Sequence, residues 1–147
     1  MSEEGSSRWS RRIGIAMLLV LVAIQFVPIG EGISNPPVTQ TVKWDSPRTE
    51  ELARRACYDC HSNETSWPWY AHIAPISWLV AHDVAEGRKH MNFSEWDRPQ
   101  KNADEAAHQL EEGEMPLTIY TILHPSARLE DAAREHLIKG LKKTLSE

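Results

Sequence analysis

The stretch Cys57-Tyr58-Asp59-Cys60-His61 has the form C-x-x-C-H, and it holds both cysteines of the chain. This pattern is typical of covalent haem attachment in c-type cytochromes. Positions i, i+3 and i+4 share one face of a helix, so two thiols one turn apart can each bind a vinyl group of the same porphyrin. The imidazole that follows can then ligate the iron. The motif therefore predicts one covalent haem c, attached through Cys57 and Cys60 with His61 as the proximal iron ligand.

Two other interpretations of the cysteine pair have to be weighed. A C-x-x-C pair also occurs in thiol-redox proteins, usually beside a βαβ pattern, and in zinc sites, which usually need a second ligand pair. No strand-rich βαβ pattern is visible, and the sequence has no further cysteine. Its seven histidines could complete a zinc site only as an irregularly spaced set. Haem attachment is therefore the favoured interpretation.

Length and charge set the broad class of the protein. A chain of 147 residues suits one small domain with an appendage. The formal net charge of −5 predicts that nucleic acid is not a partner. With both cysteines in the motif, no thiol remains for a disulfide once haem is attached.

The appendage is an apolar segment near the N-terminus. Residues 1–12 are polar, and Ile13–Ile29 then contains no charged residue. As a helix this segment would reach about 25 Å, at the short end of what spans a bilayer. No A-x-A-like cleavage site follows it, which favours an uncleaved signal anchor over a cleaved signal peptide. We therefore expect a single transmembrane helix over residues 13–30.

The basic residues predict how this helix is oriented. Arg8, Arg11 and Arg12 precede the apolar segment, and the first basic residue after it is Lys43. The positive-inside rule then places residues 1–12 in the cytoplasm. The rest of the chain would lie on the outer, periplasmic side of the cytoplasmic (inner) membrane, the side on which haem c is attached.

The remaining chain divides into a linker and one domain. Residues 31–46 contain Asn35-Pro36-Pro37 and little periodicity, which predicts an extended linker. Residues 47–147 show helical spacing and no alternating strand pattern. We expect an all-α, cytochrome c-like haem domain. Its predicted helices cover residues 48–61, 75–89, a short stretch from Ser94, 103–112 and 129–145.

A low-spin haem iron needs a second axial ligand. Met115 lies in Gly113-Glu114-Met115-Pro116, a loop beyond a helix end that could bring a thioether to the face opposite His61. Met91 also lies beside a predicted helix end. The weaker alternatives are His72, His82 and His124. Met115 is the favoured distal ligand.

Aromatic residues cluster after the motif. Four of the six tryptophans lie between residues 67 and 96, and a proline separates Trp67 from Trp69, which Tyr70 follows. Such rings could pack against haem, and we expect this of Trp67, Trp69 and Tyr70. The alternative is an ordinary aromatic core, which large aromatic residues form in most proteins.

The residues from Cys57 to Trp96 resemble a known family. The runs C-Y-D-C-H-S-N-E-T-S-W-P-W-Y, I-A-P-I-S-W, H-D-V-A-E-G-R and M-N-F-S-E-W are similar to the bacterial haem-binding domain family of small, membrane-anchored c-type cytochromes. The later G-E-M-P-L and H-P-S-A-R-L runs extend the likeness to about residues 45–145. The resemblance implies one haem c on Cys57, Cys60 and His61. By analogy with the M-P loop of other cytochromes c, it also favours Met115.

Together these features predict a membrane-anchored, periplasm-facing monohaem cytochrome that carries electrons and is not an enzyme. Its partners would be a membrane oxidoreductase or another cytochrome. One alternative is a haem-based sensor or ligand-binding module whose distal ligand is labile. Another is a haem enzyme with an open iron site, in which His72 or His82 would act as acid or base.

Overall fold

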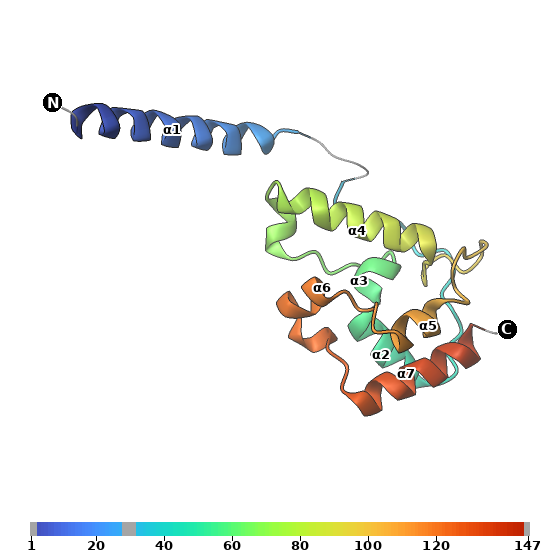
Figure 1. The fold of residues 1–147 in the computed structure, drawn as a ribbon. Helices are drawn as coiled ribbons and strands as arrows, with labels where there is room; N and C mark the ends of the chain where they lie inside the picture. The colour runs from blue at the N-terminus through green and yellow to red at the C-terminus, as the bar shows by residue number, and fades with distance from the viewer. Residues whose placement is uncertain (1–2, 28–31, 146–147) are drawn as a thin grey trace. The chain divides into compact units, whose positions relative to one another are not determined.

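The computed structural model describes residues 3–27 and 32–145, which form two compact units. One unit comprises residues up to 33 together with 68–82, and the other comprises 34–67 and 83–147. The described residues form seven α-helices, two short 3-10 helices and no sheet (Figure 1). The predicted all-α class is therefore confirmed. An isolated parallel bridge pairs Gln40 with Glu95.

The first unit contains helix α1 (Glu3–Ile24), the 3-10 helix η1 (Trp69–His72) and the first half of α4 (Ile76–His90). Across residues 3–27 and 32–145, no helix is both long enough and apolar enough to cross a membrane. The predicted transmembrane helix over residues 13–30 is thus not confirmed. Helix α1 begins in the polar N-terminal segment and ends at Ile24, and residues 28–30 lie outside the described residues. The same holds for residues 1–2, 31 and 146–147 at the edges of the predicted segments.

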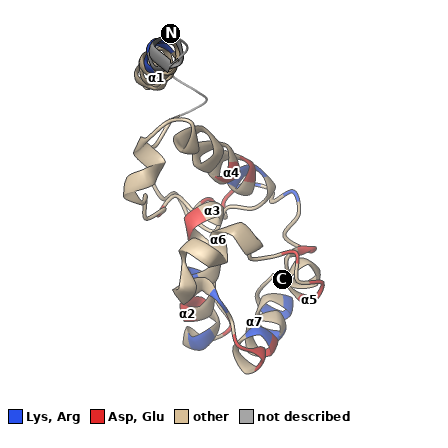
Figure 2. Ribbon diagram, turned by 60° about the vertical axis from the view of Figure 1, so that its left-hand side comes forward, with Lys and Arg blue, Asp and Glu red and all other residues tan. Residues whose placement is uncertain are grey.

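The second unit is a helical domain with one core. Its elements are α2 (Pro47–Ala56), α3 (Tyr58–His61), the second half of α4, α5 (Ala106–Glu111), α6 (Thr118–Leu123), η2 (Pro125–Ala127) and α7 (Asp131–Thr144). Helix α7 packs against α2 and α5 (Figure 1). Charged side chains lie on α7, whereas α6 carries none (Figure 2). The core residues that are at most 3 % exposed are Leu52, Ala53, Tyr58, Phe93, Leu110, Leu137 and Leu141.

Local sequence explains where helix α2 begins and which face it buries. Ser46 is extended (φ −155°), and its hydroxyl accepts a hydrogen bond from the Thr49 amide at 3.2 Å, as an N-cap residue does. Pro47 occupies the first helical position, where the amide hydrogen that it lacks would have no partner in the helix. Leu52 and Ala56 lie one turn apart and face the core.

Gly140 permits the close crossing of α7 over α2. A Cβ atom at this position would overlap the side chain of Thr49, including its Cβ at 2.9 Å. Thr49 is fully buried, so it has no room to move away. The glycine looks unfavourable by helix propensity, yet it is what lets the two helices meet.

We expect Gly140→Ala to destabilise the domain by about 2 kcal/mol or more, although alanine at an exposed helix position would stabilise by about 1 kcal/mol. Urea unfolding at constant pH measures the difference in free energy of unfolding. His136→Ala, at an exposed position of the same helix, is the control and should change it by less than about 0.5 kcal/mol. A Gly140→Ala protein as stable as the wild type would show that α2 and α7 can move apart enough to accommodate a methyl group.

Residues 34–46, predicted to be a linker, pack along the domain. Val42 is 4 % exposed, and its amide donates to the Phe93 carbonyl at 3.2 Å. The amide of Asp45 donates to the Thr144 hydroxyl at 3.1 Å. This segment is extended, but it contributes a side chain to the core.

Two helix predictions need correction. No helix begins at Ser94: residues 93–94 and 96–97 form turns on either side of the bridge residue Glu95, and the Ser94 side chain is buried among hydrogen-bond partners. The helix predicted over residues 48–61 is interrupted at Cys57, where α2 ends and α3 begins. The other predicted helices appear as α4, α5 and α7 with ends displaced by up to three residues. Helix α6 was not predicted.

Candidate functional site

A cavity of about 380 Å³ opens in the second unit, and the C-x-x-C-H segment forms one of its walls. Its volume lies in the range of small-molecule and cofactor sites. The other walls come from the end of α4, from α5, from the loop before α6 and from α6 itself. The lining residues used below are Cys57, Asp59, Cys60, His61, Asp83, Glu86, Gly87, Met91, Glu105, Gln109, Met115 and Tyr120.

The break at Cys57 turns the motif toward this cavity. Cys57 has φ −125°, outside the helical range, so α3 starts a new turn directly after it. The carbonyl of Cys57 then accepts from the amides of Cys60 at 3.2 Å and His61 at 2.9 Å. One helical turn therefore relates the three residues, as their spacing predicted. Cys57, Cys60 and His61 all line the same cavity.

Neither thiol has the lowered pKa of a redox-active cysteine pair. Burial raises the pKa of Cys57 to about 12, and the neighbouring Cys60 adds to this shift. Burial likewise raises the pKa of Cys60 to about 12, with a further contribution from the carboxylates of Asp59 and Asp83. A redox-active dithiol has a lowered pKa, because the thiolate is its nucleophile. These values therefore argue against the thiol-redox interpretation.

The imidazole of His61 is held in the form that binds a metal. Its Nδ1 lies 3.1 Å from the carbonyl oxygen of Met91, and because a carbonyl can only accept, Nδ1 carries the proton. Nε2 is then left with a lone pair for iron. Burial lowers the pKa of His61, while hydrogen bonds to the Met91 and Gly87 carbonyls oppose that shift. The His61 imidazole is thus neutral at neutral pH, and its orientation is fixed for binding a metal through Nε2.

A network of buried polar side chains holds His61 against residues 91–95. The Phe93 amide donates to the His61 carbonyl at 2.8 Å. Beside it, Asn63 accepts from Asn92 Nδ2 at 2.8 Å, and its own amide donates to the Ser94 hydroxyl at 3.0 Å. Asn63 Nδ2 donates to the carboxylate of Glu95 at 2.9 Å. This network explains why H-S-N and M-N-F-S-E occur as blocks in the sequence.

Glu95 makes this network sensitive to acid. The hydrogen bond from Asn63 holds the pKa of Glu95 below its usual value, and Arg98 contributes in the same direction. A carboxyl group with a lowered pKa stabilises the fold fully above its unfolded pKa and loses that contribution as the pH falls through the folded value. We expect Glu95→Gln to lose about 1 kcal/mol at pH 7 and to show a shallower loss of stability between pH 5 and pH 3.

Urea unfolding at several pH values measures this effect. Glu135→Gln is the matched control, because Glu135 pairs with Lys139 on the exposed surface of α7. Its variant should follow the wild-type pH dependence closely. Parallel curves for Glu95→Gln and the wild type would mean that Glu95 has no part in acid unfolding.

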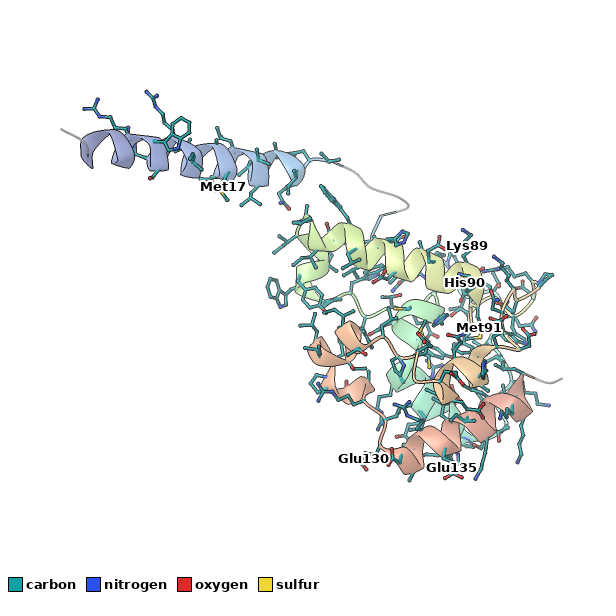
Figure 3. The ribbon with its side chains drawn as sticks, in the orientation of Figure 1. Met17, Lys89, His90, Met91, Glu130 and Glu135 are labelled. Carbon is teal, nitrogen blue, oxygen red and sulfur yellow. The ribbon has the colours of Figure 1, made fainter. Side chains whose placement is uncertain are left out.

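Gly87 brings α4 close to the cysteine turn. A Cβ atom on Gly87 would overlap the carbonyl oxygen of Cys60 and reach its carbonyl carbon at 3.0 Å. The Gly87 carbonyl accepts from the Met91 amide at 3.0 Å, which continues the helical hydrogen-bond pattern one residue beyond α4. Met91 lies directly after the C-terminal end of α4 (Figure 3). The end of α4 thereby sets the position of the carbonyl that orients His61.

A glycine turn directs Met115 to the cavity. Gly113 has φ +75°, and its amide donates to the carbonyl of Leu110, while the amide of Glu114 donates to that of Gln109. This is the Schellman pattern that ends a helix with a left-handed residue. The amide of Met115 also reaches the Gln109 carbonyl at 3.2 Å. Met115 lines the cavity together with His61, and Met91 lines it as well.

The predicted aromatic residues are not in the cavity lining. Trp67 donates from Nε1 to the side chain of Asn35, and the Arg88 guanidinium lies 6.0 Å from its ring. Trp69 and Tyr70 belong to the other unit, where their rings meet edge-on at 5.8 Å. Their packing against haem stays a prediction. The aromatic rings that do line the cavity are Phe93 and Tyr120.

The histidines considered as ligands also lie outside the lining. His72 and His82 belong to the other unit, and His124 stacks on Tyr120 with ring centroids 4.2 Å apart. The cavity does contain residues that the sequence did not single out. Four of them are acidic: Asp59, Asp83, Glu86 and Glu105. The lining of the cavity includes no lysine or arginine. Asp59 was already visible inside the motif, and Asp83 and Glu86 lie in the run H-D-V-A-E-G-R, whereas nothing in the local sequence marked Glu105.

The residues present fit a covalent haem. Both cysteines and a neutral histidine face one cavity whose walls are mainly apolar, which is the donor set of a c-type site. The fold and the site thus define an all-α haem-binding domain with a cysteine pair suited to covalent attachment. The chain belongs to the haem-binding domain family, whose sequence model matches residues 19–143. No curated protein and no solved structure matches it.

Proposed function

We propose that the protein is a monohaem cytochrome c that carries electrons and does not catalyse a reaction. The observation that carries this proposal is that Cys57, Cys60, His61 and Met115 line one cavity. Bound haem would supply a one-electron couple between ferrous and ferric iron. With His61 on one face and Met115 on the other, the chain would leave no open position for a substrate.

The hydrogen bond to His61 supports Met115 over Met91 as the distal ligand. The Met91 carbonyl binds Nδ1, on the ring edge away from Nε2. The backbone of Met91 therefore lies on the proximal side, behind the imidazole. Its side chain is 6 % exposed and belongs to the apolar core with Phe93 and Leu110. We assign Met91 the role of orienting His61 and Met115 the role of ligand.

Two features of the cavity act on the reduction potential in opposite directions. A thioether ligand raises the potential relative to two nitrogen ligands. Acidic residues in the lining, mainly the partly buried Asp59 and Asp83, would favour the more positively charged ferric state and lower the potential, whereas Glu86 is already paired with Lys89 at 3.2 Å. The expected result is a potential below that of a cytochrome with the same ligands and a neutral lining.

We further propose that the apolar N-terminal segment brings the haem domain to the outer side of the cytoplasmic membrane, where membrane oxidoreductases or other cytochromes would exchange electrons with it. The apolar side chains of α1 are exposed on all sides of the helix, with Leu18, Leu19 and Val20 each at least 60 % exposed. Protease added to spheroplasts should digest the domain, and protection of the domain would refute this location.

The function is tested by spectroscopy of the full chain, purified from a host that matures cytochromes c. A carrier should show a six-coordinate, low-spin spectrum in both oxidation states, cycle reversibly with one electron and not bind carbon monoxide. A wild-type protein that is high-spin, or that binds carbon monoxide readily, would instead be a ligand-binding or sensor module.

A further inference from the structure

Asp59, between the two cysteines, connects the haem-attachment turn to a distant helix. Its Oδ1 accepts from the Ser66 amide at 2.9 Å, which is a local contact. Its Oδ2 accepts from the Tyr120 hydroxyl at 2.7 Å, across 61 residues of sequence. Both side chains line the cavity. A hydrogen bond to a carboxylate is stronger than one between neutral groups, so this contact holds α6 firmly against the cysteine turn.

Helix α6, which carries Tyr120, buries little of its surface against the rest of the domain. It has six residues, too few for a stable helix on their own. None of its residues is fully buried, and Ile119, Ile122 and Leu123 are each more than 55 % exposed. The helix follows Met115 by only two residues. Movement of α6 would therefore move the methionine.

We propose that Tyr120 is a positioning residue for the distal ligand. Its hydrogen bond to Asp59 fastens α6 to the cysteine turn and so keeps the Met115 thioether at the cavity. This hydrogen bond joins the segment that carries the distal ligand to the segment that carries the proximal ligand. Its strength sets how readily Met115 leaves, and hence whether the protein works as a closed carrier or admits an external ligand. This inference rests on the proposed assignment of Met115.

The Tyr120 side chain is also held by His124, the residue that follows α6. Its ring stacks on His124 at 4.2 Å, and its carbonyl oxygen lies 3.1 Å from the Nδ1 atom of that histidine. The phenol therefore meets Asp59 in a fixed direction. Tyr120→Phe keeps the ring and its stacking, and it removes only the hydroxyl that reaches Asp59.

The test compares Tyr120→Phe with the wild type as haem-loaded full chains. Both should retain covalent haem. We expect the rate of carbon monoxide binding to the ferrous variant to rise at least tenfold, and amide hydrogen exchange over residues 115–123 to become faster. Thr121→Val is the matched control, because it removes a hydroxyl from α6 whose partner is the nearby Thr118 carbonyl. This control should behave like the wild type.

A second variant keeps the test independent of one substitution. Asp59→Asn leaves a weaker, neutral acceptor, so its carbon monoxide binding should lie between those of the wild type and Tyr120→Phe. The double variant should bind no faster than Tyr120→Phe alone, because both changes remove one contact.

Equal carbon monoxide binding in Tyr120→Phe, Thr121→Val and the wild type would overturn the positioning role. Failure of the ligand assignment looks different: the wild type and Met115→Ala would then bind carbon monoxide at the same rate, whatever residue 120 is.

Discussion

Replacing Cys57 and Cys60 with alanine is expected to abolish covalent haem attachment completely. The two thiols and His61 line the same cavity and share one helical turn, and the chain contains no other cysteine to form a thioether. Haem stain on a denaturing gel and the intact mass of the purified chain measure attachment. The wild type should carry one haem that survives denaturation, and the double variant should carry none.

The single variants sharpen this result. Cys57→Ala and Cys60→Ala each keep one thiol on the turn, so each should attach haem in reduced yield through one thioether. Haem retained by the double variant after denaturation would refute the site on which every other proposal depends.

Replacing Met115 with alanine is expected to open the iron. The ferric protein should lose the weak long-wavelength band of a sulfur-ligated haem and become high-spin. The ferrous protein should bind carbon monoxide at least a hundredfold faster, and the reduction potential should fall because the thioether is gone. Absorption spectra in both oxidation states, stopped-flow mixing with carbon monoxide and a potentiometric titration measure these changes.

Met91→Leu is the matched control for this experiment. It removes the other thioether in the cavity at nearly constant volume, which usually costs less than about 1.5 kcal/mol of stability in a core. The carbonyl that binds His61 remains, so the spectrum should stay low-spin. If Met91→Leu opened the iron and Met115→Ala did not, the assignment of the two methionines would be reversed.

The predictions that held came from local patterns. The predicted helix from residue 48 appears as α2, whose start is set by Ser46 and Pro47 because capping depends on neighbouring residues alone. The C-x-x-C-H spacing predicted one face for three side chains because a single helical turn relates them, and that turn survives the break at Cys57. The predicted helix at Ser94 failed because the serine hydroxyl is taken by the distant Asn63 amide, a partner that no local pattern shows.

The sequence by itself determined the helical class, the membership in a haem-binding family and which three residues are predicted to hold haem, because all of these are encoded in short-range spacing. Only the tertiary structure decided which carbonyl orients His61, why Gly87 and Gly140 must be glycine, and that Asp59 meets Tyr120. The contact between Asp59 and Tyr120 joins segments 61 residues apart, and that between Gly140 and Thr49 joins segments still further apart. They form when the core packs, and packing depends on the whole set of side chains and not on any one stretch of the chain.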